Sequence, residues 1–551
     1  MVKNPFEIRG LSMIKSVVSR INLVLFFIST SLLIVLLATV GCKKKSSGGD
    51  YGLKKSETLR VRIIGEPPTL DWHKSSDTTS SFIITNLMEG LVQFNYTGPE
   101  VTLSPALATS WESSEKAKVW TFQIREGVKW SDGEVFEPKH IVDGWERLLN
   151  PATASQYAYY LYGIKNAKAY NEGSLKDFSK VGLELKGNTL KVTLEKPMQF
   201  PFMLTHSSTF PVRTDIVNKY GDQWTEPQNI VTLGAYNLIK WEHDKALLAT
   251  ANPLFFDRPA KTKNVVFYVI QETQTAINLF DAGKIDAIRT LPPQDIPALK
   301  RRKEYIDYSI LSTYYYGFNT SKAPVDNPLV RKAIIHAIDR SQIVKMMQGG
   351  QKPLSGWIPF GMFGYDPSVG LAFDPVRAKK LLQEAGYDES NPLPKIQLSF
   401  NTLDAHKKIA ENVQAQLKEN LGITLEIKNE EWKVYLETLK VNPTHMFRMA
   451  WVADYPDPNN FFEIQLSYGN NNRTKWKNKE YDKLIEDAVA IIADKPKRLE
   501  MYAKAHKILV NDDAPVFPIY TAVAQNLIAD RVVSFPTNVM YEFRLKNTSV
   551  Q

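Results

Sequence analysis

The chain contains a single cysteine, and this one residue most constrains how the protein can fold. Without a second cysteine there is no disulfide framework and no thiolate cluster for a metal, so a hydrophobic core must hold the fold together. Cys42 stands just after an apolar run over residues 21–40, which a Lys- and Arg-containing start precedes. This pattern predicts a targeting segment, so residues 1–41 are set apart from the fold.

Two interpretations of this segment are open. In the first, residues 1–41 are a lipoprotein signal peptide, Cys42 becomes the lipidated N-terminus, and residues 42–56 form a flexible polar tether. In the second, the apolar run stays as an uncleaved anchor, because 20 apolar residues can span a bilayer. The position and isolation of Cys42 favour lipidation, although Thr39 stands where such signals more often have Leu. Met13 is an alternative start to Met1.

Composition narrows the class of protein. A length of 551 residues with 43% hydrophobic residues gives ample material for a large core, and it suggests roughly three domains. The net charge of +9 is mild for this length, and no dense Lys/Arg block follows the tether. Nucleic-acid binding is therefore not expected.

The body of the chain alternates strand-like and helical segments without a long linker. Residues 59–64, 120–125 and 190–194 have the composition or the period-2 alternation of strands. Asp374-Pro375 opens one predicted helix, and Asn327-Pro328 opens another. The mixture predicts α/β domains.

Catalytic and metal-binding signatures are not found in the sequence. It has no His-Glu-x-x-His, no Gly-x-Ser-x-Gly, no phosphate-binding loop and no dinucleotide-binding glycine motif. The eight histidines are scattered and do not have metal-ligand spacing. We expect no enzyme activity, no resident metal and no cofactor.

Ordered motifs along nearly all of the chain beyond residue 57 carry a family resemblance. They are residues 66–71 (EPPTLD), 88–91 (MEGL), 105–112 (PALATSWE), 120–133 (WTFQIREGVKWSDG), 232–236 (TLGAY), 281–286 (DAGKID), 326–333 (DNPLVRKA) and 378–387 (AKKLLQEAGY). The chain resembles the large extracytoplasmic solute-binding proteins of the peptide/nickel class, family 5. Within that class, residues 400–408, 429–433 and 448–458 look most like the oligopeptide-binding proteins of bacterial ABC transporters.

The resemblance implies a set of ligand-binding residues. Asp454 would bind the α-ammonium group of a peptide, and Arg448 and His406 would lie where the family neutralises the C-terminal carboxylate. Asn401, Trp432 and Trp451 would line side-chain pockets. The run from Tyr314 through Tyr315 to Tyr316 would face the cleft. These roles agree with the chemistry of a free peptide, which has a cation at one end and a carboxylate at the other whatever its sequence.

Structural interpretations of the same residues stay open from spacing alone. Asp454 is also suited to cap the Pro-rich turn that follows it, and His406 also fits the exposed first turn of a helix. Arg448 also fits a structural ion pair, and Trp432 and Trp451 also fit a plain core. Asp457 is expected to be structural. Gln348 stands where relatives can have a lysine for the carboxylate of short peptides.

The resemblance also implies the architecture: an α/β, two-lobed periplasmic-binding-protein fold of the large three-domain peptide-binding type, with a hinge and a buried cleft. Residues 57–88, 213–313 and 523–551 would form lobe 1, and residues 89–212 an additional domain packed on it. Residues 314–522 would form lobe 2, which supplies most ligand contacts.

The function implied is capture of oligopeptides and their delivery to an ABC importer, by a monomer anchored in the cell envelope through lipid on Cys42. The partners implied are the oligopeptide and the permease subunits of the transporter. Two alternatives remain open: another cargo, such as a murein peptide or a metal chelate, and a peptide sensor that is not coupled to transport. Preferred peptide length, side-chain bias, affinity and the choice of membrane do not follow from the sequence.

Overall fold

The computed structural model describes residues 51–551. Residues 55–551 form one compact unit. Cys42 lies outside the described residues, so the structure does not test its lipidation. Within residues 51–551, no helix combines the length and the apolar character that a membrane span needs.

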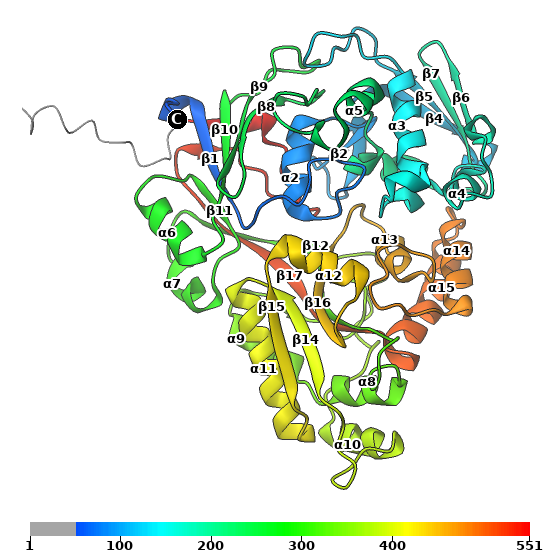
Figure 1. Cartoon of the computed structure of the whole chain (residues 1–551), viewed down its shortest axis with the longest axis vertical. Helices are drawn as coiled ribbons and strands as arrows, with labels where there is room; N and C mark the ends of the chain where they lie inside the picture. Colours follow the sequence, from blue (N-terminus) through cyan, green and yellow to red (C-terminus); the bar gives the residue numbers. More distant parts are fainter. Residues whose placement is uncertain (1–50) are drawn as a thin grey trace, which may run out of the picture. The chain divides into compact units, whose positions relative to one another are not determined.

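The largest element of residues 55–551 is an 11-stranded sheet in the order β15-β14-β16-β12-β17-β11-β1-β10-β9-β8, with β13 also paired to β17. Figure 1 shows β8, β9 and β10 at one end of this sheet and β14 and β15 at the other. The strands are β1 (Thr58–Ile63), β8 (Tyr236–Glu242), β9 (Ala246–Ala251), β10 (Asn264–Val269), β11 (Ala287–Arg289), β12 (Tyr305–Phe318), β13 (Lys352–Pro353), β14 (Ile396–Asn401), β15 (Leu425–Glu430), β16 (Met446–Val452) and β17 (Val516–Ile528).

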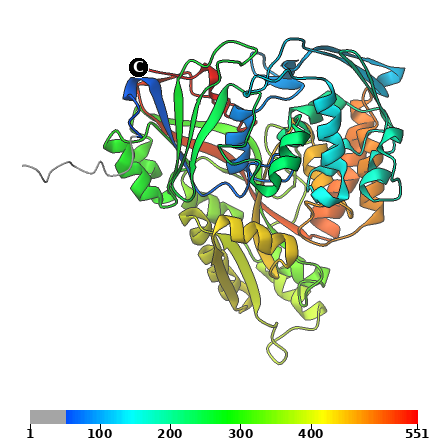
Figure 2. The same ribbon diagram turned by 45° about the horizontal axis from the view of Figure 1, so that its top comes forward.

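Two long antiparallel strands join the two ends of this sheet. The first part of β12, residues 305–309, pairs with residues 523–527 of β17, and residues 313–317 pair with residues 516–521 after an irregularity. β11 pairs with the far part of β17, whereas β16 pairs with the last part of β12. Figure 2 shows β17, in red, running from the neighbourhood of β1 towards the orange helices.

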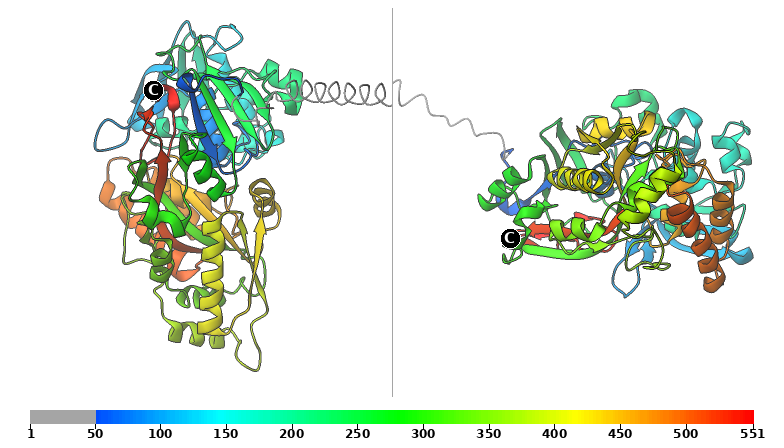
Figure 3. Two further views of the ribbon diagram at one scale, coloured as in Figure 1. Left: turned by 90° about the vertical axis from the view of Figure 1, so that its left-hand side faces the viewer. Right: turned by 90° about the horizontal axis from the view of Figure 1, so that it is seen from below.

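Helices connect these strands along the chain. They are α2 (Thr78–Leu87), α6 (Thr273–Asp281), α7 (Ile296–Leu299), α8 (Pro328–His336), α9 (Arg340–Met347), α10 (Pro375–Glu384), α11 (Asp404–Leu421), α12 (Trp432–Val441), α13 (Asn459–Phe462), α14 (Lys479–Val489) and α15 (Lys495–Lys507). α11 packs along β14 and β15, as both views of Figure 3 show. A π-helical turn, Ile508–Asp512, extends α15.

A smaller antiparallel sheet forms within residues 89–212. Its strand order is β4-β5-β7-β6, and α3 (Lys139–Leu149), α4 (Ala167–Asn171) and α5 (Thr214–Tyr220) lie near it in Figure 1. Its strands are β4 (Ala108–Ser114), β5 (Val119–Ile124), β6 (Leu183–Lys186) and β7 (Thr189–Thr193), and two short pairs are made by β2 (Val92–Asn95) with β3 (Thr102–Pro105) and by β18 (Val532–Val533) with β19 (Ser549–Val550).

The local signals in the sequence are confirmed. The strands expected over residues 59–64, 120–125 and 190–194 correspond to β1, β5 and β7 within one residue at each end. Asn327 and Asp374 cap α8 and α10, because each side chain accepts a backbone N–H of the first turn and a proline follows each cap. The α/β fold class is also confirmed.

The buried apolar residues fall into three large clusters. One joins β1, β5 and the helices of residues 130–210 to buried residues of α14 and α15, such as Tyr481 and Tyr502. A second cluster fills the space between helices α8, α10 and α11 and the strands β12, β14, β15, β16 and β17. A third lies under α6 and α7. Residues 454–510 therefore share a core with residues 89–212. The lobe boundaries expected from the sequence stay a prediction.

A buried ion pair fixes the position of β11 beside β1. The Asp286 carboxylate accepts hydrogen bonds from Arg60 Nε (3.0 Å), Arg60 Nη2 (2.7 Å) and the Arg60 backbone N–H (2.9 Å). Arg531 Nη1 lies 2.9 Å from the same carboxylate. The Asp286 side chain is 1% exposed, so solvent does not screen these contacts.

We predict that Asp286→Ala lowers the free energy of unfolding by about 3–5 kcal/mol, because it leaves the buried Arg60 without its carboxylate. Asp530→Ala is the matched control: Asp530 pairs with Lys303, and both side chains are more than half exposed. That change should cost less than about 1 kcal/mol. Chemical denaturation of the three proteins measures the difference, and equal losses would contradict the assignment.

Candidate ligand-binding site

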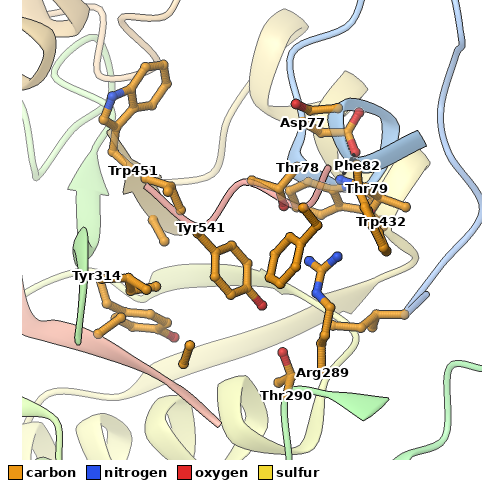
Figure 4. Close-up of a pocket in the computed structure, with 18 of the residues that line it drawn as sticks. Asp77, Thr78, Thr79, Phe82, Arg289, Thr290, Tyr314, Trp432, Trp451 and Tyr541 are labelled. Carbon is orange, nitrogen blue, oxygen red and sulfur yellow. Dashed lines mark hydrogen bonds between the residues drawn. The ribbon is translucent and has the colours of Figure 1, made fainter. Parts of the chain in front are cut away.

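A cavity of about 380 Å³ lies among the long strands, and strands from the middle of the main sheet contribute to its walls. Its lining includes residues of β1, β11, β12, β16 and β17, the N-terminal parts of α2, α11 and α12, and residues 540–543. Figure 4 shows several of these side chains pointing into the space between the strands. A volume of this size suits a small organic ligand.

The structure brings seven of the eight predicted ligand-binding residues to this one cavity. They are Asn401, His406, Trp432, Arg448, Trp451, Asp454 and Tyr314. They come from residues 314–454, and β12, β14, β16, α11 and α12 place them together. The sequence interpretation that treats them as separate structural residues does not explain why they share a cavity.

The expectation that Tyr315 faces the cavity is wrong. Successive side chains of a strand point to opposite faces, so Tyr315 must leave the cavity if Tyr314 enters it. The Tyr315 ring packs edge-on against Trp357 at 4.7 Å, and the residue is 2% exposed. Tyr316 returns to the first face but is buried against Phe517. Of this tyrosine run, Tyr314 alone lines the cavity within the described residues.

Asp454 lies two residues beyond the end of β16, and neutral groups surround its carboxylate. Tyr160 Oη donates to Asp454 Oδ2 at 2.5 Å, and Tyr157 Oη lies 3.5 Å from the same oxygen. Asn460 holds the turn, because its Oδ1 accepts the Asp454 backbone N–H at 2.8 Å. No Lys or Arg pairs with this carboxylate within residues 51–551, where the nearest basic group is His206 at 3.8 Å.

The groups around Asp454 come from residues 155–209, which the sequence interpretation missed. Burial lowers the pKa of His206, although the Asp454 charge opposes the shift, so the imidazole is neutral near pH 7. Burial and the Asp454 charge both raise the pKa of the Tyr157 and Tyr160 hydroxyls, which therefore stay protonated as donors. The sequence does contain a signal, namely four tyrosines within residues 157–162.

A second carboxyl group, Glu463, lies behind Asp454. Its oxygens accept hydrogen bonds from the side-chain amides of Asn459 (2.8 Å) and Asn460 (3.2 Å). Burial raises the pKa of Glu463 to about 8, and the charge of Asp454 adds to the shift. Near pH 7 this cluster therefore holds a protonated Glu463, and the Asp454 side chain lines the cavity with no Lys or Arg partner within residues 51–551.

Arg448 presents a cation to the same cavity. Its Nη1 donates to Asn401 Oδ1 at 3.2 Å, and its guanidinium lies 4.6 Å from the centroid of the Tyr314 ring. The buried Nε atom has no hydrogen-bond partner. No ion pair of the described residues includes Arg448, so its role is not that of a structural ion pair, and its guanidinium is available to an anion.

His406 is buried in the first turn of α11, not exposed there. Its Nδ1 and the Tyr314 hydroxyl share a hydrogen bond of 3.3 Å, and the residue is 6% exposed. Burial, together with the nearby charge of Arg448, lowers the pKa of His406 well below its ordinary value. His406 is therefore a neutral hydrogen-bonding group beside Arg448 rather than a second cation.

Two tryptophans complete the walls. Trp451 Nε1 donates to Asn460 Oδ1 at 2.9 Å, which ties this ring to the Asp454 turn. Trp432 Nε1 lies 3.3 Å from Asp77 Oδ1 on the N-terminal cap of α2, so α12 and α2 meet across the cavity. Both residues line the cavity, and both indole N–H groups have hydrogen-bond partners.

The arrangement can bind a molecule with one cationic and one anionic end. A carboxylate without a cation and a guanidinium without an anion line one enclosed space, and neutral polar and aromatic groups separate them. Among the described residues, no group of three His, Cys, Asp or Glu side chains is placed to hold a metal ion.

Comparison with known proteins agrees with this geometry. The family model for bacterial extracellular solute-binding proteins, family 5, matches residues 102–473. The oligopeptide-binding protein OppA of Bacillus subtilis is 35% identical over 517 residues, which cover 90% of this chain and 93% of that protein. The structure of Haemophilus influenzae OppA in complex with RPPGFSPFR has a TM-score of 0.85 at 31% identity, over 90% of this chain and 99% of that one.

Two solved forms of one relative bear on the conformation. The structure of the Escherichia coli murein tripeptide binding protein MppA matches with a TM-score of 0.86 at 30% identity, over 90% of this chain and 99% of that one. The structure titled the unliganded open form of MppA has a TM-score of only 0.62 at 31% identity, over 90% and 98%. The arrangement in residues 55–551 therefore differs from that open form.

Glu463 makes the stability of the protein depend on pH. Its pKa of about 8 in the folded protein lies above its ordinary value of 4.5, so the folded state binds a proton that the unfolded chain has lost. The free energy of unfolding should therefore fall as pH rises from about 4.5 to 8. We predict that Glu463→Gln makes this fall smaller, as thermal unfolding across that pH range would measure.

The exposed Glu112 on β4 provides the control, because Glu112→Gln should leave the pH profile of the native protein unchanged. A profile for Glu463→Gln that matches the native one would contradict the assignment of a protonated Glu463.

Proposed function

The chain belongs to family 5 of the bacterial extracellular solute-binding proteins, and from this premise we propose that it captures oligopeptides outside the cytoplasmic membrane and delivers them to an ABC importer. The observation that carries the proposal is the pair of unmatched charges in one cavity, Asp454 and Arg448. The family consists of binding proteins, and the proposal assigns this chain no reaction.

Asp454 is proposed to bind the α-ammonium group of the peptide. Enclosing an ammonium ion removes several kcal/mol of hydration, which a carboxylate must offset. Tyr160 and Asn460 hold the Asp454 side chain by neutral contacts, so its negative charge remains for the ligand. The donors beside it leave the carboxylate oriented before the ligand arrives.

Arg448 is proposed to bind the C-terminal carboxylate of a short peptide, with His406 and Asn401 beside it. The planar guanidinium can donate to both oxygens of a carboxylate. Asn401 already accepts one N–H of Arg448 and so fixes the orientation of the guanidinium group. The neutral His406 ring can add a hydrogen bond without adding charge.

The peptide backbone has a free strand edge to pair with. Within the described residues, β16 pairs with β14 only at Met446 and Phe447, whereas its other edge pairs with β12 from Met446 to Val452. Residues 448–453 also line the cavity. A peptide added beside this edge would be recognised by main-chain hydrogen bonds, which do not depend on its side chains.

Closure of two lobes about a hinge is proposed to enclose the ligand. The lobes are those expected from the sequence: residues 57–88, 213–313 and 523–551 with 89–212 on one side, and residues 314–522 on the other. Contacts between residues of the two proposed lobes, such as Trp432 with Asp77 and Lys408 with Gln294, support a closed arrangement. The weaker match to an open unliganded relative supports it as well.

The proposed location is the cell envelope, at the periplasmic or extracellular face of a membrane, where lipid on Cys42 anchors a monomer that meets the permease subunits. Cargo of another kind has one specific point in its favour, the likeness to a murein tripeptide binding protein. A peptide sensor without transport remains the other alternative.

The role of Asp454 can be measured by titration calorimetry with a tripeptide, a tetrapeptide and their N-acetylated copies. We predict that acetylation, or Asp454→Asn, weakens binding by a factor of a hundred or more, about 2.7 kcal/mol. Asp457→Asn is the matched control, because Asp457 lies in the same turn but pairs with Arg498 and does not line the cavity.

In that control, the preference for the free ammonium group should remain. Equal binding of free and acetylated peptides by the native protein would contradict the role of Asp454. A murein tripeptide in the same series tests the alternative cargo, and no heat with any free peptide would refute peptide binding.

The proposed lipidation of Cys42 can be tested by substitution. Cys42→Ser should abolish the incorporation of labelled fatty acid and release the protein from the membrane fraction of cells, whereas Ser46→Ala in the tether should change neither. If Cys42→Ser stays in the membrane fraction at the native level, the apolar run over residues 21–40 is an uncleaved anchor instead.

A further inference from the structure

Arg289, the last residue of β11, presents a second guanidinium to the cavity. It is 9% exposed, and its Cζ lies 4.4, 4.9 and 4.1 Å from the ring centroids of Phe82, Tyr541 and Phe543. Figure 4 shows this group beside Phe82 and Tyr541, on the opposite side of the view from Trp451 and Tyr314. Trp451 shares Asn460 with Asp454, so Arg289 lies away from the proposed ammonium site.

No anion of the described residues meets Arg289. It is in no ion pair there, and its Nε atom is buried without a hydrogen-bond partner. The two carboxylates that line this part of the cavity are committed elsewhere. Asp77 accepts the N–H groups that begin α2 and the Trp432 N–H, whereas Glu542 pairs with Arg544. Aromatic rings hold the Arg289 cation in place but do not neutralise its charge.

A second buried arginine stands beside it. Arg62, on β1, also lines the cavity and is 1% exposed. It donates to the carbonyls of Ile270 (2.8 Å), Gln271 (2.9 Å) and Thr290 (3.2 Å), and it is in no ion pair within residues 51–551. Burial lowers the pKa of Arg62 to about 10. The charges of Glu272 and Asp404 oppose this shift, whereas the charge of Arg289 adds to it. An anion bound here would relieve the repulsion between two buried cations.

Two residues next to Arg289, its chain neighbour Thr290 and its ring contact Tyr541, have a left-handed backbone conformation. Thr290 has φ = +68° and Tyr541 has φ = +55°, and both residues line the cavity. Left-handed backbone is an outlier for a β-branched or bulky residue, and such outliers cluster at ligand-binding sites. At Thr290 this conformation directs its carbonyl to Arg62 while its N–H donates to Gln525.

We propose that Arg289 is a second carboxylate-binding residue of the cavity, with Arg62 as the buried charge behind it. Its ligand is a carboxylate out of reach of Arg448. It comes from an acidic side chain or from the C-terminus of a longer peptide, and the chemistry of recognition is the same for both. The inference rests on the proposed function and adds that the site selects peptides by where they carry negative charge.

Calorimetric titration of the full mature protein tests this with paired peptides. One series has a free C-terminus and differs by Glu against Gln at positions 2 to 5. The other has no acidic residue and differs by C-terminal acid against amide at lengths of three to six residues. We expect the native protein to bind the carboxylate member about 30-fold more tightly at one position or length. Which series shows the preference identifies the source of the carboxylate.

Arg289→Gln should reduce this preference to within about threefold and leave the affinity for the neutral member within about threefold. Arg289→Lys, which keeps the charge but loses the planar fork, should retain part of the preference. Arg301→Gln, at an exposed position, is the charge-matched control and should retain all of it. Thermal unfolding of each variant shows whether the aromatic surroundings of residue 289 tolerate the change.

The inference is overturned if Arg289→Gln keeps the full preference. It is also overturned if the native protein shows no preference for the carboxylate member in either series, or if Arg448→Gln abolishes every preference that it shows. These two results can be obtained even if the Arg289 variants do not fold. If neutral peptides bind in an Asp454-dependent manner without such a preference, the proposed function stands and this inference alone fails. Absence of binding by every peptide would overturn both.

Discussion

The antiparallel pairing of β12 with β17 is the constraint on which the rest of the structure depends. These strands run through the middle of the main sheet, so strands from distant parts of the chain are ordered outward from them. β16 is paired to one side of β12, and β11 is paired to one side of β17. Arg448 and Arg289 thereby reach one cavity although 159 residue positions separate them in sequence. Side chains of these two strands, such as Tyr314 stacked on Tyr520 with 4.6 Å between the ring centroids, line the cavity.

The charged side chains of the cavity have different partners from the buried carboxylates of the core. In the core, Asp286 pairs with Arg60 and Arg531, and Asp71 pairs with Arg147, so these two buried carboxylates have partners of opposite sign. In the cavity, Asp454 is met by hydroxyl and amide groups, whereas Arg448 and Arg289 are met by aromatic rings and an amide oxygen. Unpaired charges of both signs in the cavity favour a ligand that has both signs of charge. A peptide with free ends is such a ligand.

Much of this architecture could be predicted from the sequence, and the rest could not for physical reasons. Caps such as Asn327 and Asp374 are local, so the sequence predicts where α8 and α10 begin. The placement of Asp454 and Arg448 in one cavity followed from motifs that carry a family resemblance. Tyr315 was assigned to the wrong face because strand alternation was not applied to the tyrosine run. Tyr160, His206 and Arg289 were missed because the sheet order and the packing of residues 89–212 bring them to the cavity, and no local pattern encodes that.

The most direct test of the account is a crystal structure of the protein without residues 1–42, bound to a tetrapeptide with free ends. The account predicts the peptide inside the cavity, with its ammonium nitrogen about 2.8 Å from the Asp454 carboxylate and its C-terminal carboxylate on an arginine of the cavity wall. A peptide bound in the reverse direction, or bound outside this cavity with Asp454 still free, would contradict it.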